Sequence, residues 1–186
     1  MFQYKKHLAY PINIKKKDLK MAKYIITQYG GPYGELGAAL RYLNQRYNMP
    51  DEKGKALLTD IATEEFGHVE MICAMVYQLT KGASIKEMKE AGLDLNYAQH
   101  GAEITPSDVF GVPFSTTGMG FTGDALADLS EDMAAEEKAR ATYENLIDLT
   151  EDESLRGPLL FLRQREIVHF NRFKELYKEY KKKGYK

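Results

Sequence analysis

Apolar and polar residues follow one another along most of the chain with the period of an α-helix. Apolar positions recur at spacings of three and four residues over long stretches, which is typical of helices that bury one face. Gly30, Gly31 and Pro32 interrupt the first of these stretches. The expected long helices are 18–48 (with that interruption), 51–81, 124–149 and 150–182.

A long irregular segment, 93–121, separates the second long helix from the third. It shows no sustained period and is too long for an ordinary turn. A helix of about thirty residues is about 45 Å long, so such a segment can return along the bundle and start the third helix parallel to the second. Short connections within each pair and one long crossover between the pairs favour an all-α, ferritin-like four-helix bundle, which we expect to be a single domain over 1–186.

Two capping-box patterns predict helix starts. Ser84 followed by Glu87 predicts a short helix after the second long one, and Thr150 followed by Glu153 predicts the start of the fourth.

Composition narrows the class of protein. Hydrophobic residues make up 44% of the chain, yet no run of about 18 apolar residues predicts a membrane span, and the first residues lack the apolar core of a secretory signal. Cys73 is the single cysteine, which fits an intracellular protein without disulfides. We therefore expect a cytoplasmic location and no membrane partner.

Charge is distributed unevenly. Residues 1–23 carry seven Lys and one Asp, a net charge of +6, and residues 172–186 carry seven Lys or Arg and two Glu, a net charge of +5. We interpret the basic ends, about 1–17 and 181–186, as solvated tails, and we expect no nucleic-acid partner. The middle of the chain is acidic, and some of its carboxylates fall on apolar helix faces.

A Glu-x-x-His pattern occurs on two of the expected helices. Glu65 and His68 stand three residues apart in the second helix, and Glu166 and His169 repeat the spacing in the fourth, so each pair leaves one helix face. One further glutamate lies among small and apolar residues on each remaining helix. These are Glu35 in the first helix and Glu136 in the third. One Glu on each of two helices and a Glu-x-x-His on the other two is typical of dinuclear carboxylate sites in helix bundles.

Charge balance explains why this combination suits two metal ions. Four carboxylates neutralise two divalent cations in a core of low dielectric constant, and neutral imidazoles complete each ion without adding charge. Without metal the carboxylates would repel one another, which would raise their pKa values. Oxygen and nitrogen ligands suit manganese or iron, and the residues alone do not choose between them.

Other residues near these motifs are weaker candidates. Glu137 competes with Glu136 as the ligand, and we favour Glu136 because it follows two alanines. Glu64 is one helical step from Glu65, which predicts either a solvent-facing side chain or one behind the ligands. Tyr42 follows Glu35 by seven residues, nearly on the same face, where it can hydrogen-bond near the metals or act as a core tyrosine.

Five motifs carry a resemblance to the manganese catalase family, and the resemblance covers nearly the whole chain. They are GGPYGELGAALRYLNQ, DIATEEFGHVEM, GVPFSTTGMGFTGDALADL, EDMAAEEKARATYENLIDLT and FLRQREIVHF. The chain is most similar to the short branch of that family that occurs as a spore coat component. The resemblance implies two manganese ions that convert hydrogen peroxide to oxygen and water, and a homo-oligomer, usually a hexamer.

The resemblance also implies a role for each motif residue. Glu35 and His68 would bind one ion, Glu136 and His169 the other, and Glu65 would bridge them. Glu166 would handle protons instead of binding metal, and Tyr42 would be hydrogen-bonded near the cluster. The arginine that pairs with the proton-handling glutamate in some members has no certain match, and the candidates are Arg140, Arg163 and Arg165.

The chain ends soon after the fourth helix, whereas longer members of the family have a C-terminal arm that wraps their neighbours. Two other functions stay open at this point. One is a ferritin-like di-iron oxidase or ferroxidase, because the same ligands bind iron. The other is a structural coat protein that keeps a non-catalytic metal site and binds other spore coat proteins.

Overall fold

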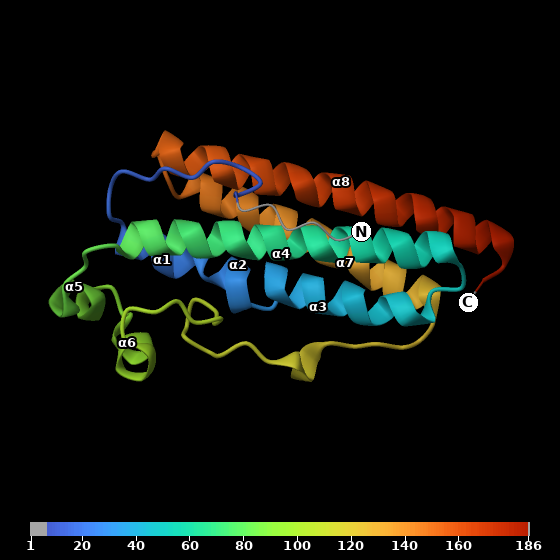
Figure 1. Ribbon diagram of the computed structural model, residues 1–186, viewed down its shortest axis with the longest axis horizontal. Coiled ribbons are helices and arrows are strands. Elements are labelled where there is room, and N and C mark those ends of the chain that lie inside the picture. The colour runs from blue at the N-terminus through green and yellow to red at the C-terminus, as the bar shows by residue number, and fades with distance from the viewer. Residues whose placement is uncertain (1–6, 186) are drawn as a thin grey trace.

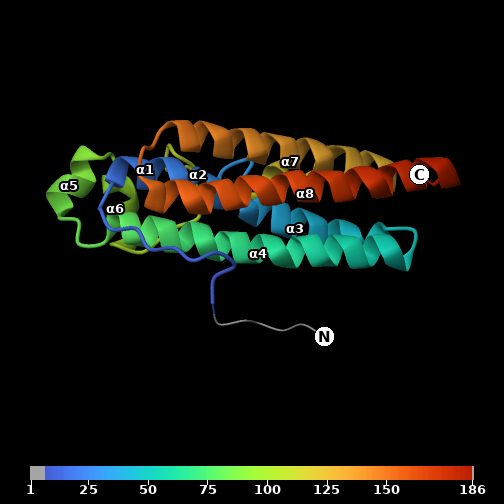
Figure 2. The ribbon, with the colours of Figure 1, turned by 90° about the horizontal axis from the view of Figure 1, so that it is seen from above.

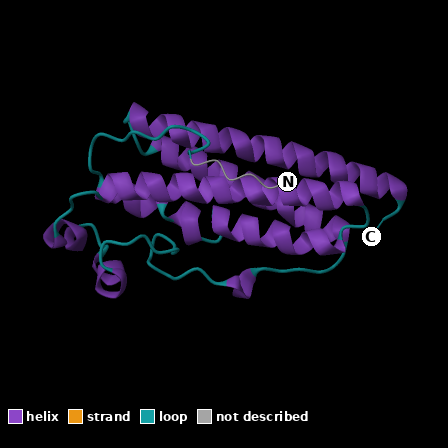
Figure 3. Ribbon diagram, viewed as in Figure 1, coloured by secondary structure: helices purple, strands orange, loops and turns teal. Residues whose placement is uncertain are grey.

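The computed structural model describes residues 7–185 and consists of helices joined by loops, with no strand in that range and one isolated bridge between Ser107 and Pro113 (Figures 1 and 3). The helices are α1 (Leu19–Ile25), α2 (Thr27–Gly30), α3 (Glu35–Gln45), η1 (Arg46–Asn48), α4 (Glu52–Thr80), α5 (Ile85–Glu90), α6 (Asp94–His100), η2 (Thr116–Gly118), α7 (Ala125–Asp148) and α8 (Glu153–Lys183).

The bundle is built from two helix pairs. α3 packs along α4 and α7 packs along α8, while α1 continues the line of α3 on the other side of the Gly-Gly-Pro break and also packs on α4 (Figure 2). The predicted all-α bundle with a crossover between its second and third long helices is confirmed.

Aspartate side chains cap the starts of the three longest helices, α4, α7 and α8. Asp51 accepts a hydrogen bond from Gly54 N, Asp124 from Leu126 N and Ala127 N, and Asp152 from Ser154 N. Such caps each contribute about 1 kcal/mol, because they satisfy amides that have no partner within the helix.

Of the two capping boxes predicted from the sequence, one is confirmed and the other is wrong. The capping box of Ser84 and Glu87 is present at the start of α5. The box expected from Thr150 and Glu153 does not form, because Asp152 caps α8 and Thr150 Oγ1 accepts from Asp152 N at 3.2 Å instead. Aspartate directly before the first helical residue is the better placed acceptor.

The crossover is more ordered than its sequence indicates. The segment expected to be irregular contains α6, a helix of two turns, and then runs back along α3 (Figure 1). It passes very close to the break before α3: a Cβ at Gly30 would lie 2.4 Å from backbone atoms of both Pro106 and Ser107. Glycine at this position therefore lets the crossover pack beside the start of the helix that carries Glu35.

The N-terminal segment is not a solvated tail over its whole length. Ile12 and Ile14 are buried, Ile14 N donates to Gln78 Oε1 at 2.7 Å, and Gln78 Nε2 donates to the carbonyl of Ile12 at 3.1 Å. At the other end, α8 continues through Lys183 and ends at Gly184, whose φ of 72° is left-handed. Residues 1–6 and 186 lie outside the described part of the chain.

Two apolar clusters fill the bundle, one toward each end. One joins α1 to the second half of α4, the end of α7 and the first half of α8. The other joins α3 to the first half of α4, the start of α7 and the second half of α8. The buried glutamates and histidines predicted from the sequence lie on α3, α4, α7 and α8 between the segments that build these two clusters.

Candidate metal centre

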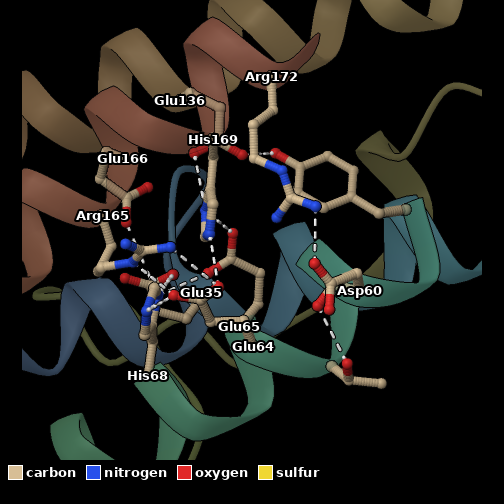
Figure 4. Close-up of polar contacts among 12 residues, drawn as sticks. Glu35, Asp60, Glu64, Glu65, His68, Glu136, Arg165, Glu166, His169 and Arg172 are labelled. Carbon is tan, nitrogen blue, oxygen red and sulfur yellow. Dashed lines mark hydrogen bonds and ion pairs between the residues drawn. The ribbon is translucent and has the colours of Figure 1, made fainter. Parts of the chain in front are cut away.

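Six ionisable side chains from four helices meet in the middle of the bundle (Figure 4). Each is at most 2% exposed to solvent, although all are charged or titratable. They are Glu35 on α3, Glu65 and His68 on α4, Glu136 on α7, and Glu166 and His169 on α8. The structure thus brings together every residue that the Glu-x-x-His pattern and the resemblance assigned to the site.

Glu65 stands between the two histidines. Its Oε2 lies 2.6 Å from His68 Nδ1 and its Oε1 lies 2.8 Å from His169 Nδ1, so each carboxylate oxygen faces one imidazole. The two rings are nearly parallel, with centroids 5.6 Å apart. Both imidazoles present Nδ1, not Nε2, to the centre of the cluster.

The remaining glutamates divide between the two histidines. Glu35 Oε2 is 3.5 Å from His68 Nδ1, and Glu136 Oε2 is 3.6 Å from His169 Nδ1. Glu166 approaches the cluster from α8, with Oε1 3.7 Å from His68 Nδ1. Ligand atoms lie within 4.8 Å of one another in two groups, Glu35, Glu65, His68 and Glu166 in one, and Glu65, Glu136, Glu166 and His169 in the other.

The donor set fits two divalent cations. Both oxygens of Glu65, the Nδ1 atoms of both histidines, Glu136 Oε2 and Glu166 Oε1 are buried without a hydrogen-bond partner. Unpaired buried polar atoms cost free energy, and in native proteins they call for an ion, a water or a functional role. Carboxylate oxygens and imidazole nitrogens that converge without partners are what two oxygen- and nitrogen-preferring metal ions require.

Without metal, the charges in this cluster shift pKa values in opposite directions. Burial, together with the charge of Glu65, raises the pKa of Glu35 to about 7. Burial and the nearby carboxylates likewise raise the pKa of Glu166 well above its ordinary value and raise that of Glu136. Burial alone would also raise the pKa of Glu65, but the two imidazoles beside it hold that pKa below the usual range.

The histidines shift toward the charged form. Burial opposes protonation of His169, yet Glu65, Glu136 and Glu64 raise its pKa to about 11. Without metal, the charges of the cluster therefore favour protons where cations would otherwise bind.

Two tyrosines join α3 and α7 through hydrogen bonds to the glutamates of the cluster. Tyr42 on α3 donates to Glu136 Oε1 at 2.5 Å, and Tyr143 on α7 donates to Glu35 Oε1. Both hydroxyls are fully buried. Tyr42 was predicted from the sequence, whereas Tyr143 was missed, even though Tyr143 follows Glu136 by the same seven residues that separate Tyr42 from Glu35.

Glu64 and Arg165 form an ion pair beside the cluster. Arg165 Nε donates to Glu64 Oε1 at 2.5 Å, and the oxygens of Glu64 lie near the Nε2 atoms of both histidines (Figure 4). Among the contacts of the described residues, neither Arg140 nor Arg163 reaches Glu166: both pair with Glu144, and Arg140 also pairs with Glu137. The three arginines proposed as partners of Glu166 therefore all pair with other glutamates.

Other candidates from the sequence lie away from the cluster. Glu137 is partly exposed and pairs with Arg140, whereas its neighbour Glu136 is buried. His7 and His100 are exposed and take no part in the cluster.

A narrow space reaches the cluster between α3 and α7. It has a volume of about 10 Å³ and touches Glu35, Glu136 and Glu166, and small residues such as Ala38, Ala135 and Ala139 line it. A space of this size holds about one molecule as small as water.

The family model described as "Manganese containing catalase" matches residues 1–185. The chain belongs to the manganese catalase family. Membership implies a dinuclear metal site, which the buried Glu and His cluster fits, and the family fold confirms that the bundle is ferritin-like.

Individual members of the family align with nearly the whole chain. Protein CotJC of Bacillus subtilis strain 168 is 54% identical over 175 residues, which cover 94% of this chain and 92% of that protein. A manganese catalase of Bacillus subtilis is 33% identical over 192 residues, covering 96% and 70% of the two chains. The crystal structure of wild-type KatB, a manganese catalase from Anabaena, superposes with a TM-score of 0.86 at 34% identity, covering 96% of this chain and 80% of that one.

No helix within the described residues is long and apolar enough to cross a membrane, in agreement with the sequence.

Proposed function

We propose that the protein binds two manganese ions in this cluster and disproportionates hydrogen peroxide to oxygen and water. The observation that carries the proposal is the position of Glu65, whose two oxygens face the Nδ1 atoms of His68 and His169. Family membership supports manganese over iron, because the donor set alone suits either metal.

The residues divide between the two ions by proximity. Glu35 and His68 would hold one ion, Glu136 and His169 would hold the other, and Glu65 would bridge them. Tyr42 and Tyr143 donate to the oxygens of Glu136 and Glu35 that face away from the histidines, which fixes the direction of each carboxylate.

The chemistry needs two electrons and two protons to move in each half of the cycle. When bound, the pair of manganese ions supplies a reversible two-electron couple. One peroxide releases two protons and two electrons as it becomes oxygen, and a second takes up two of each as it becomes two waters. Glu166 is placed to take and return a proton, since it is buried beside the cluster and its pKa is raised.

The narrow space between α3 and α7 supports a very small substrate. Peroxide is hardly larger than water, and alanines along this path leave room that larger side chains would fill. Bulkier peroxides are expected to be poor substrates for the same reason.

The test combines metal analysis and peroxide turnover on one purified sample. We expect two manganese ions per chain and one oxygen molecule released for every two peroxide molecules consumed. His68→Ala should lose both the bound manganese and the release of oxygen. Iron in place of manganese together with rapid ferrous oxidation would instead support a di-iron oxidase.

We also propose that the protein acts as a homo-oligomer, with a hexamer expected from the family resemblance, and that it is associated with the spore coat. The coat association rests on the resemblance to the short branch and on the 54% identity to Protein CotJC over nearly its full length. Fractionation of spores with an antibody to this chain tests it, and recovery of the chain only from the cytoplasm would exclude the coat. Metal-loaded protein without peroxide turnover would support a structural coat role.

A further inference from the structure

Glu64 lies against both histidines on the side of each ring that faces away from the ligand carboxylates. Its Oε2 is 3.2 Å from His169 Nε2 and its Oε1 is 3.6 Å from His68 Nε2. Glu65, the next residue of α4, faces the Nδ1 atoms of the same two rings. The two imidazoles are therefore held between successive glutamates of one helix (Figure 4).

Arg165 holds Glu64 in this place. Its Nε donates to Oε1 at 2.5 Å and its terminal nitrogen donates to Oε2 at 3.2 Å, a two-bond contact between α8 and α4. Such a fork fixes the plane of a carboxylate as well as its position. Both side chains are little more than a quarter exposed.

Glu64 and Arg165 occupy matching places in the two Glu-x-x-His segments, each directly before the glutamate of its pair. Two glutamates at these matching places would bring like charges together beside the histidines. Because arginine occupies one of these places, only the carboxylate of Glu64 remains, and it lies beside both imidazole rings.

We infer that Glu64 is a positioning residue that accepts the Nε2 proton of both histidines and so leaves both Nδ1 atoms free to bind metal. A neutral imidazole carries one proton, and an acceptor at Nε2 keeps that proton on Nε2, which directs the lone pair of Nδ1 toward the ions. The inference rests on the proposed dinuclear site, but not on the metal's identity or on peroxide turnover.

A neighbouring ion pair offers a matched control for a merely structural role. Asp60 and Arg172 also join α4 to α8, with Arg172 donating to Asp60 Oδ2 at 2.6 Å, and among the described residues no hydrogen bond or ion pair links them to either histidine (Figure 4). Removing this pair disturbs the same helix contact without touching the imidazoles.

The experiment measures Mn(II) affinity of the full-length, metal-free protein by competition with a chelator. We expect Glu64→Ala to weaken binding 10- to 100-fold, the usual effect of losing a partner of a ligating histidine. Arg165→Gln should weaken it less but in the same direction, and Asp60→Ala and Arg172→Gln should stay within twofold of the unchanged protein. Circular dichroism of each metal-free variant checks that it folds.

Glu64→Gln gives a second readout that packing alone would not produce. Its amide oxygen can accept from one imidazole, while its NH₂ group faces the other ring's N–H and cannot accept. The two ions should then bind unequally, one close to normally and one weakly.

Unchanged Mn(II) affinity in Glu64→Ala, or an equal loss in Asp60→Ala, would overturn the inference. A protein that binds two ions but does not decompose peroxide would refute the proposed reaction and leave the role of Glu64 standing. A protein that binds neither Mn(II) nor Fe(II) would refute both.

Discussion

Removing the metal should make the protein's stability fall as the pH rises through the weakly acidic range. The folded-state pKa of Glu35 is raised from 4.5 to about 7, because the carboxyl is buried and faces the charge of Glu65. A group with a raised folded pKa stabilises the fold fully below its unfolded pKa and loses that contribution as the pH rises through its folded pKa. The window for Glu35 therefore runs from about pH 4.5 to about pH 7.

The size of the effect follows from that shift. Each pKa unit corresponds to about 1.4 kcal/mol, so Glu35 accounts for about 3 kcal/mol across the window. Glu136 and Glu166 shift in the same direction and add to it. For a chain of this length, about 3 kcal/mol lowers the melting temperature by roughly 6–12 °C.

Calorimetry of EDTA-treated protein between pH 5 and 7.5 measures how the melting temperature changes with pH. We expect the melting temperature to fall with rising pH in the metal-free protein and to fall less in Glu35→Gln, which keeps only the contributions of Glu136 and Glu166. Metal-loaded protein should show no such fall, because cations replace the protons and bind more tightly as the pH rises. A metal-free melting temperature that stays flat or rises over this range would show that ionisation of these buried carboxyls does not control stability.

Three further predictions concern single side chains. Tyr143→Phe removes one hydrogen bond to a buried carboxylate and should destabilise the metal-free protein by about 1.5–3 kcal/mol in urea unfolding; a loss below about 0.5 kcal/mol would show that the bond to Glu35 matters little. Ala135→Leu should fill the narrow space between α3 and α7, slowing peroxide turnover at least tenfold while two metal ions still bind, and normal turnover would place the route elsewhere. Gly54→Ala should cost about 1–3 kcal/mol, because the new Cβ would lie 2.0 Å from the Tyr180 hydroxyl, and an unchanged melting temperature would contradict this contact.

Much of the fold and most of the cluster could be predicted because both depend on spacing along helices. Glu65 and His68 share a helix face however the helices pack, and so do Glu166 and His169. Tyr143 was missed although the same reasoning reaches it: it stands seven residues after Glu136, as Tyr42 does after Glu35.

The remaining features depend on how helices meet, which spacing alone does not give. The contact of Glu64 with His169 and Arg165 requires the relative register of α4 and α8, and so does the choice of Arg165 over Arg163 beside the site. Burial of the N-terminal segment was not predicted, because Ile12 and Ile14 lie in a lysine-rich stretch.

Anomalous diffraction at the manganese absorption edge, from crystals of the manganese-loaded protein, tests the proposed dinuclear site most directly. The proposed site predicts two peaks in the middle of the bundle, one at His68 Nδ1 with Glu35 and the other at His169 Nδ1 with Glu136, with Glu65 contacting both. A single peak, peaks elsewhere on the chain, or ligation through Nε2 would contradict it.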